Sequence, residues 1–302
     1  MDVNRDAIDT SAVADGAMLG IQFHKIYESS VYDVYVKNAW SWGIMVIEGA
    51  NIPNADRDAN ILIENCILDN CGKNLTLSSG LHGGIISTHH NGNLLIRGNI
   101  CRNSNANGII LEDATKRNII TNNRIKDNSG DGIFTSGANL RSCIIGNIID
   151  SNGRDGIDMG VGAARFVVAN NLVQSNTEYG MNIKSGLHTI QGNICYQNGE
   201  SGIFIDNSNS DATNCSVVGN FCENNGQSAP TYGDGITCIG GTSRSTFTGN
   251  VCYGASAGAT QVYGIRNTSN TVAIVANVCQ NNATGQLSDT GATTQVANNI
   301  IT

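Results

Sequence analysis

The chain has 302 residues and a formal net charge of −8, yet only 14% of its residues are charged and 5% are aromatic. It is rich in asparagine and contains 36 glycines, 10 cysteines and only 2 prolines. Apolar residues make up 40% of the chain, enough for a sizeable core, but the lack of long helix-forming runs argues against a helical bundle. No stretch approaches the roughly 20 consecutive apolar residues of a membrane-spanning helix, and no basic stripe is present to neutralise phosphates. We therefore expect neither a membrane nor a nucleic-acid partner.

The first segment, residues 1–19, lacks a basic region followed by an apolar one, so no signal peptide is recognisable. We interpret this segment as the remnant of an N-terminal cap. The protein is then either cytoplasmic when made or shortened at its front end.

From about residue 20 onward the sequence repeats one unit: an apolar triplet, a small residue, Asn, a short apolar run, a polar corner, and then Gly-Ile with more apolar residues. One example runs from Leu95 to Cys101 and continues from Asn107 to Leu111. The marker asparagines are Asn65, Asn99, Asn123, Asn147, Asn171, Asn193, Asn220, Asn250, Asn277 and Asn299. The glycines that open the second strand are Gly20, Gly43, Gly84, Gly108, Gly132, Gly156, Gly180, Gly202, Gly235 and Gly264.

A repeat of this length with two or three short strands is too small for a propeller blade and lacks the leucine frame of a leucine-rich repeat. The sequence therefore predicts an all-β fold, a single-stranded right-handed parallel β-helix (solenoid) of about 11 coils, with residues 1–302 as one domain. Equivalent strands would lie ~4.8 Å apart. Asn is expected to form hydrogen-bonded ladders at the corners, where it also tolerates a left-handed backbone.

Cysteine replaces Ile or Val at one inward position, two residues after the marker Asn, as at Cys101, Cys195, Cys222, Cys252 and Cys279. A small hydrophobe fits there. Because the coil spacing exceeds the preferred Cβ separation of a disulfide, we expect buried, free thiols.

The Asn-x-Ile/Cys and Gly-Ile-x-Ile units resemble the repeats of the pectate-lyase-like superfamily, which includes polygalacturonases, polysaccharide lyases, alginate epimerases, inulin fructotransferases and phage tailspike depolymerases. The resemblance covers nearly all of residues 20–301 and implies a polysaccharide substrate bound across one outer sheet. It also implies a longer N-terminal cap than residues 1–19 supply. The chain is therefore a fragment, possesses a partner that caps it, or belongs to a virion or phage tail or to a secreted protein after removal of an N-terminal segment. Tailspikes of this superfamily are trimers, which makes a homotrimer an open expectation.

The outward positions of the Gly-Ile strands gather the scarce charges into one patch. Alternation of side chains along a strand places Asp158 outward on the same strand that Asp155 precedes, and Asp131 one coil earlier. Paired carboxylates suit proton transfer at a glycosidic bond, and acids stacked on adjacent coils raise one another's pKa. We predict Asp155 and Asp158 as the acid/base pair, assisted by Asp131 and Lys184. The predicted substrate contacts are Phe134, Tyr179, Asn182, Phe204, Asp206, Glu112, Arg154 and His82.

The alternative for the acids is structural, because Asp before Gly is a favoured turn residue. The comparison with polygalacturonases is partial. Asp131-Gly132-Ile133 and Asp155-Gly156-Ile157 match the placement of that family's catalytic acids, but its paired Asp-Asp and its Gly-His-Gly turn are missing. The Asp-Pro-His motif of alginate epimerases is absent too.

The leading hypothesis is cleavage of a surface or extracellular glycan by hydrolysis or β-elimination. No cofactor is certain and no metal ligand is assigned. Elimination would need the uronate to be neutralised, either by Ca²⁺ on the Asp cluster or by Lys184 or Arg154. One alternative is a non-catalytic glycan-binding or structural tailspike module, and another is a uronan C5-epimerase.

Overall fold

The computed structural model describes residues 20–24, 26–47, 59–72, 83–88, 92–112, 115–207, 212–228, 232–241, 243–255 and 260–302. The proposed cap remnant 1–19 and His82 lie outside these residues. The described residues contain only strands, bridges, turns and bends. None of their segments forms a helix long and apolar enough to cross a membrane.

Thirty-three strands form three parallel sheets of eleven strands each. The first sheet contains β1 (Ile21–His24), β4 (Trp42–Ile47), β7 (Gly83–Thr88), β10 (Asn107–Leu111), β13 (Ile133–Thr135), β16 (Ile157–Met159), β19 (Met181–Ile183), β22 (Ile203–Asn207), β25 (Ile236–Gly240), β28 (Tyr263–Asn267) and β31 (Gly285–Asp289). The second contains β2 (Ser30–Tyr32), β5 (Leu62–Glu64), β8 (Leu95–Arg97), β11 (Ile119–Thr121), β14 (Cys143–Ile145), β17 (Val167–Ala169), β20 (Thr189–Gln191), β23 (Ser216–Val218), β26 (Thr246–Thr248), β29 (Ala273–Val275) and β32 (Gln295–Ala297). The third contains β3 (Tyr35–Lys37), β6 (Ile67–Asp69), β9 (Ile100–Arg102), β12 (Arg124–Lys126), β15 (Ile148–Asp150), β18 (Leu172–Gln174), β21 (Ile194–Tyr196), β24 (Phe221–Glu223), β27 (Val251–Tyr253), β30 (Val278–Gln280) and β33 (Ile300–Ile301).

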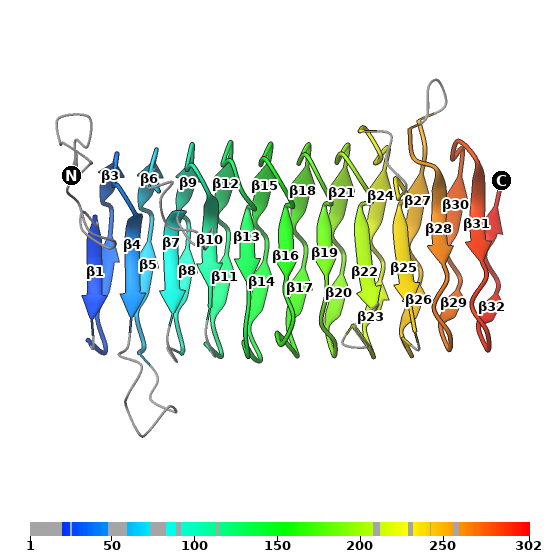
Figure 1. Ribbon diagram of the computed structural model, residues 1–302, viewed down its shortest axis with the longest axis horizontal. Helices are drawn as coiled ribbons and strands as arrows, with labels where there is room; N and C mark the ends of the chain where they lie inside the picture. The colour runs from blue at the N-terminus through cyan, green and yellow to red at the C-terminus, as the bar shows by residue number, and fades with distance from the viewer. Residues whose placement is uncertain are drawn as a thin grey trace.

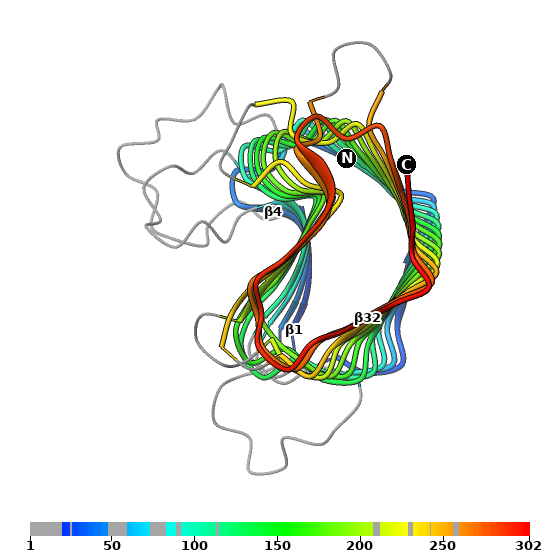
Figure 2. The same cartoon turned by 90° about the vertical axis from the view of Figure 1, so that its right-hand side faces the viewer.

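The strands stack into an elongated solenoid in which each strand pairs with its equivalent one coil away (Figure 1). The predicted parallel β-helix of about eleven coils is confirmed. Viewed along the axis, the coils superimpose, and the outline is indented along the first sheet (Figure 2). Every coil therefore presents the same position of the repeat at the same place on the surface.

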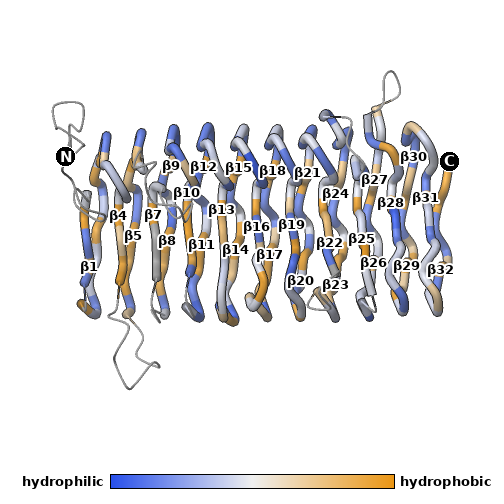
Figure 3. Tube along the Cα trace, viewed as in Figure 1, coloured by the Kyte–Doolittle hydropathy of each residue, from blue (hydrophilic) through white to orange (hydrophobic). Residues whose placement is uncertain are grey.

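The core follows from the alternation of side chains along each short strand. Apolar and polar segments alternate around every coil (Figure 3). The Ile of each Gly-Ile pair points inward, as predicted, and Ile109, Ile133 and Ile157 stack with no exposed surface. The glycine before them is needed for close approach, because a Cβ on Gly108 would lie 2.3 Å from Cγ2 of Ile125.

The marker asparagines form the predicted ladder. Oδ1 of Asn147 accepts hydrogen bonds from both the backbone and the side-chain amide of Asn123, each at 3.0 Å. Its own Nδ2 donates to the carbonyl of Ile120 and to Oδ1 of Asn171. The left-handed backbone, however, belongs to the preceding residue, such as Gly146 or Asn122, rather than to the marker itself.

The repeat register at the first marker asparagine, in the second coil, differs from the sequence-based alignment by one residue. Cys66, not Asn65, occupies the ladder position, because its backbone N–H donates to Oδ1 of Asn99. Asn65 instead has the left-handed φ of 51°. The inward residue of β6 is therefore Leu68, which is fully buried and pairs with Cys101.

All ten cysteines are free thiols, as predicted, and nine of them are buried. Cys195, Cys222, Cys252 and Cys279 lie on consecutive strands of the third sheet, each paired with the next. Cysteine thus fills the core where neighbouring coils carry Val173 or Ile149.

We expect the Asn147→Ala variant to lose about 3 kcal/mol or more of unfolding free energy, since each buried polar group left unpaired costs ~1–3 kcal/mol. The variant leaves the amides of Asn123 and the carbonyl of Ile120 without their partner. Urea unfolding followed by circular dichroism measures the change. Ile148→Thr, at an exposed outward position of the same coil, is the matched control and should change stability by at most ~0.5 kcal/mol. Equal losses in both variants would contradict a ladder role.

Candidate functional site

Three aspartates converge on the outer side of the first sheet. Asp131 directly precedes the Gly-Ile pair that opens β13, Asp155 holds the same position before β16, and Asp158 lies within β16. One carboxylate oxygen from each lies within 4.8 Å of the other two. The structure therefore brings together the three acids that the sequence analysis grouped, and we call them the acid cluster.

One oxygen of each corner aspartate has a structural role. Oδ1 of Asp131 accepts the backbone N–H of Asp155 at 3.1 Å, and Oδ1 of Asp155 accepts that of Tyr179 at 2.9 Å. Asn107 does the same for Asp131 one coil earlier, at 2.6 Å. The turn interpretation of these acids is therefore correct for Oδ1, which continues a corner ladder.

The second oxygens are placed differently. Oδ2 of Asp131 is buried without a hydrogen-bond donor, although an Arg154 nitrogen lies 3.6 Å away. Oδ2 of Asp155 accepts from Nδ2 of Asn182 at 2.8 Å, while Oδ1 of the same asparagine is buried and unpartnered. A proton on Asp155 can pair with that amide oxygen if the amide is turned over. The second oxygens thus remain available for proton transfer.

Two cations cover the acid cluster. Nζ of Lys184 contacts both oxygens of Asp158, at 2.9 and 3.1 Å. Arg154 lies between Asp131 and Glu178, with ion-pair distances of 3.6 and 3.8 Å. The side chains of Lys184 and Arg154 are 32% and 51% exposed, so an approaching ligand meets the cations first.

Burial and mutual repulsion keep protons on the cluster. Burial, followed by the charges of Asp158 and Asp131, raises the pKa of Asp155 to about 8. Burial and the charge of Asp158 raise the pKa of Asp131 to about 6. Burial also raises the pKa of Asp158, against the opposing pull of Lys184. At neutral pH Asp155 therefore holds a proton, whereas Asp131, with the lower pKa, can accept one.

Outward-pointing side chains of this sheet are less exposed than strand alternation alone suggests. Asp131 and Asp155 have no exposed surface, and Asp158 and Asn182 are 2% and 5% exposed. Lys184 lies against Asp158, and Arg154 lies against Asp131. A substrate must displace a cation before it reaches a carboxylate.

The aromatic residues form a row beside the acids. Tyr179 and Phe204 stack with ring centroids 4.3 Å apart, and Phe204 meets Tyr232 at 5.5 Å. Phe204 is only 5% exposed, so its ring face is covered by its neighbours. Phe134 instead packs into a small outer cluster with Ile110.

The remaining predicted contacts lie further away. Glu112 follows β10, one coil before β13 and two before β16, and Asp206 lies in β22, two coils after β16. Sequence reasoning did not assign Asn107, which contacts Asp131, or Glu178, which contacts Arg154. Asn107 occupies the same corner position as Asp131, so the repeat alignment itself carried the signal for it.

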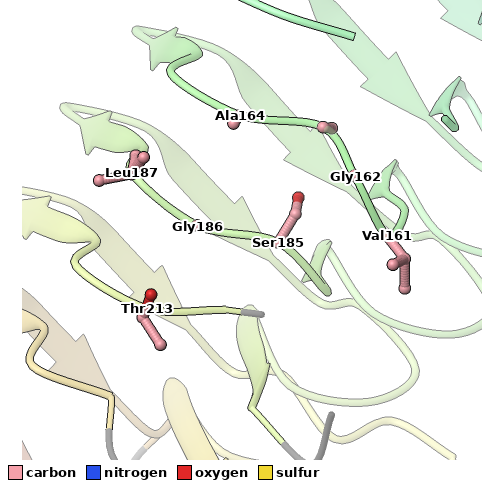
Figure 4. A pocket seen from close by; sticks show the side chains of 8 residues that line it. Val161, Gly162, Ala164, Ser185, Gly186, Leu187 and Thr213 are labelled. Atoms are coloured by element: carbon pink, nitrogen blue, oxygen red, sulfur yellow. The ribbon is translucent and has the colours of Figure 1, made fainter. Parts of the chain in front are cut away.

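A small hollow of about 240 Å³ lies away from the acid cluster, at turns of successive coils (Figure 4). Its lining includes Val161, Ser185, Leu187 and Thr213, and no lining side chain is charged. Nothing in this lining supports acid/base chemistry or selection of a charged sugar.

The acid cluster fits a calcium ion poorly. Ca²⁺ requires six to eight oxygen ligands. Both oxygens of Asp158 are already taken by Lys184, and one oxygen of each corner aspartate accepts a backbone N–H. The ammonium group of Lys184 therefore already provides the positive charge beside Asp158, and the acids leave too few free oxygens for a metal.

A family model described as right handed beta helix region matches residues 18–187 and 83–251, so the chain belongs to this family. Among solved structures, the chain is similar to the A-module of the Azotobacter vinelandii mannuronan C-5 epimerase AlgE6, with 15% identity and a TM-score of 0.72 over 93% of this chain and 77% of that one. It is also similar to the A-module of the mannuronan C-5 epimerase AlgE4 from the same organism, with 14% identity and a TM-score of 0.67 over 92% of this chain and 75% of that one. A third similar structure is the DFA-IIIase of Arthrobacter chlorophenolicus A6, with 11% identity and a TM-score of 0.61 over 85% of this chain and 66% of that one. No curated protein matches the sequence. At these identities the likeness shows a shared fold.

We expect Asp155→Asn to stabilise the protein at alkaline pH. The unfolded carboxyl loses its proton near its ordinary pKa of 3.8, whereas the folded one keeps it up to about 8. The unfolding free energy of the natural protein should therefore fall as pH rises from about 4 to about 8. Asn imitates the protonated state, so the advantage of the variant should grow over that interval and then level off.

Urea unfolding at pH 5, 7 and 9 measures this advantage. Asp150→Asn, at a partly exposed carboxylate in the third sheet, is the control. An advantage of Asp155→Asn that does not change with pH would show that the carboxyl is ionised throughout.

Proposed function

We propose that this protein binds a uronate-containing polysaccharide across the first sheet and cleaves it by β-elimination at the acid cluster. The observation that supports the proposal is the layering of charge: two partly exposed cations, Lys184 and Arg154, lie over three buried carboxyls. Cations at the entrance select an acidic sugar, and the acids beneath supply proton transfer.

The elimination uses two of the acids. The uronate carboxylate binds Lys184 and Arg154, which draws Nζ of Lys184 away from Asp158 and makes the C5 proton more acidic. Asp158 takes that proton, the electron pair forms the C4=C5 double bond, and the C4–O bond breaks. The leaving oxygen takes the proton of Asp155, whose raised pKa keeps it protonated near neutral pH. The carboxylate of Asp131 accepts the backbone N–H of Asp155 and so holds Asp155 in place. The charge of Asp131 also raises the pKa of Asp155.

Hydrolysis by an inverting mechanism fits the spacing less well. Inverting glycosidases separate their carboxyl groups by about 6.5–9.5 Å to admit a water molecule, and retaining ones by about 5–5.5 Å. The oxygens of the acid cluster lie within 4.8 Å of one another. The spacing therefore leaves no room for the water of an inverting mechanism.

Epimerisation at C5 is the second candidate, supported by the likeness to two mannuronan C-5 epimerases. It begins with the same proton abstraction but returns a proton to the opposite face of the ring. The three acids all approach from the side of the sheet, which favours elimination. Product analysis by proton NMR separates an unsaturated end from an inverted C5.

We expect Asp155→Asn and Asp158→Asn each to lower turnover of an acidic polysaccharide at least ~100-fold, the lower range for losing a general acid or base. Absorbance of the unsaturated uronate and formation of reducing ends, measured over a panel of acidic and neutral glycans, detect the reaction. Asp150→Asn should retain full activity. New reducing ends without absorbance would indicate hydrolysis, and binding without either signal would indicate a glycan-binding module.

Activity should have an alkaline limit near pH 8, because turnover requires the proton that Asp155 loses there. On the acid side activity should fall as Asp158 becomes protonated, since its carboxylate acts as the base. The ratio kcat/KM measured from pH 4 to 10 tests both limits, because its pH profile reports the ionisation of the free enzyme. A rate that keeps rising above pH 9 would exclude Asp155 as the acid.

A further inference from the structure

A second charged site lies on the same face of the first sheet. Arg266 in β28 lies in the outward row of Asp158, four strands further along the sheet. At ~4.8 Å per strand the two positions are about 19 Å apart. The acid cluster does not use this site, and the sequence analysis assigned it no role.

The guanidinium of Arg266 is held along one edge by Asp234 and lies against two tyrosine rings. Nε lies 2.8 Å from Oδ2 of Asp234, and Nη2 donates to Oδ1 at 3.0 Å. The rings of Tyr263 and Tyr232 lie 4.7 and 5.5 Å from its central carbon. An arginine fixed in this way loses little conformational entropy when it binds a ligand.

Both carboxylate oxygens of Asp234 already have partners within the protein. Its side chain is buried and also accepts hydrogen bonds from the hydroxyl of Thr237 at 2.7 Å and from the backbone N–H of Tyr263 at 3.0 Å. Nη1 of Arg266, by contrast, has no hydrogen-bond partner within the described part of the chain, and the side chain is 18% exposed. One edge of the guanidinium therefore remains for a ligand.

An aromatic row connects this site to the acid cluster. Tyr179 donates its backbone N–H to Asp155, stacks on Phe204, and Phe204 meets Tyr232, which lies against Arg266. A polysaccharide lying along the axis from the acid cluster would pass this row and reach Arg266.

We propose that Arg266 binds a carboxylate of the same polysaccharide several sugar residues from the cleavage point, forming a distal subsite that makes affinity depend on chain length. The proposal rests on the proposed function, because it takes the uronate polymer as the ligand. A planar guanidinium can donate two parallel hydrogen bonds to the two oxygens of a carboxylate. Because Arg266 is held in place, it offers its N–H donors in a fixed direction. Asp234 is a positioning residue in this arrangement.

The test compares oligouronates of two to eight residues on the natural protein, Arg266→Gln and Arg266→Lys. We expect Arg266→Gln to raise KM about 10-fold or more for the longest oligomers, the effect of one charged hydrogen bond, and to leave KM of the shortest and kcat unchanged. Arg266→Lys should be intermediate, because it keeps the charge but not the fork. Arg124→Gln, an exposed cation on the third sheet, should behave as the natural protein at every length.

Isothermal titration with the same oligomers keeps the proposal testable if no glycan is cleaved, since the length-dependent loss of binding in Arg266→Gln does not require turnover. Circular dichroism and the melting temperature verify that the variant folds. A lower melting temperature with unchanged KM and Kd at every length would mean that the Arg266–Asp234 pair is structural only and would overturn the proposal. An equal loss for short and long oligomers would also overturn it, because the contact would then not be distal.

Discussion

The stacking of each strand on its equivalent in the next coil determines the rest of this structure. Parallel hydrogen bonding at ~4.8 Å places identical repeat positions directly over one another. Such stacking benefits Asn, whose amide both donates and accepts, as in the ladder through Asn123, Asn147 and Asn171. It penalises acids at equivalent positions, because like charges are held at short range. Burial is the first cause of the raised pKa values of Asp131 and Asp155, and the charges of neighbouring aspartates brought close by this register add to it.

The acid cluster shows how a structural ladder becomes a chemical site. At the corner before β13 and β16, Asp keeps the acceptor oxygen with which Asn107 begins the same ladder. An Asp in place of Asn exchanges the donating side-chain NH2 group for a second oxygen, Oδ2. At Asp131 this Oδ2 accepts no hydrogen bond. The site is thus destabilised relative to an asparagine ladder, which is typical of places where a fold gives up stability for function.

The sequence predicted the fold well because the repeat fixes both the strand positions and the direction of each side chain. The same logic correctly grouped Asp131, Asp155, Asp158 and Lys184. It could not predict the one-residue shift that places Cys66 in the ladder, because Asn65 matches the repeat equally well by letter. Nor could it predict burial: alternation says that Asp158 points outward, but not that Lys184, which directly follows β19 one coil away, covers it.

The charge balance of the acid cluster explains why an acidic ligand suits it. The three carboxyls of the cluster face two cations, Lys184 and Arg154, and the proton on Asp155 reduces the excess of negative charge around them. A neutral sugar offers the cations nothing in exchange for their carboxylates and would leave buried charges unpaired. A uronate carboxylate can replace Asp158 as the partner of Lys184, so the cation remains paired while the base is released. The clamp around Arg266 follows a different logic, since Asp234 stays paired and only the outer edge of the guanidinium is offered. At the acid cluster, a uronate that replaces Asp158 as the partner of Lys184 releases the base that starts the reaction. At Arg266 no catalytic group is released, so this site is suited only to binding.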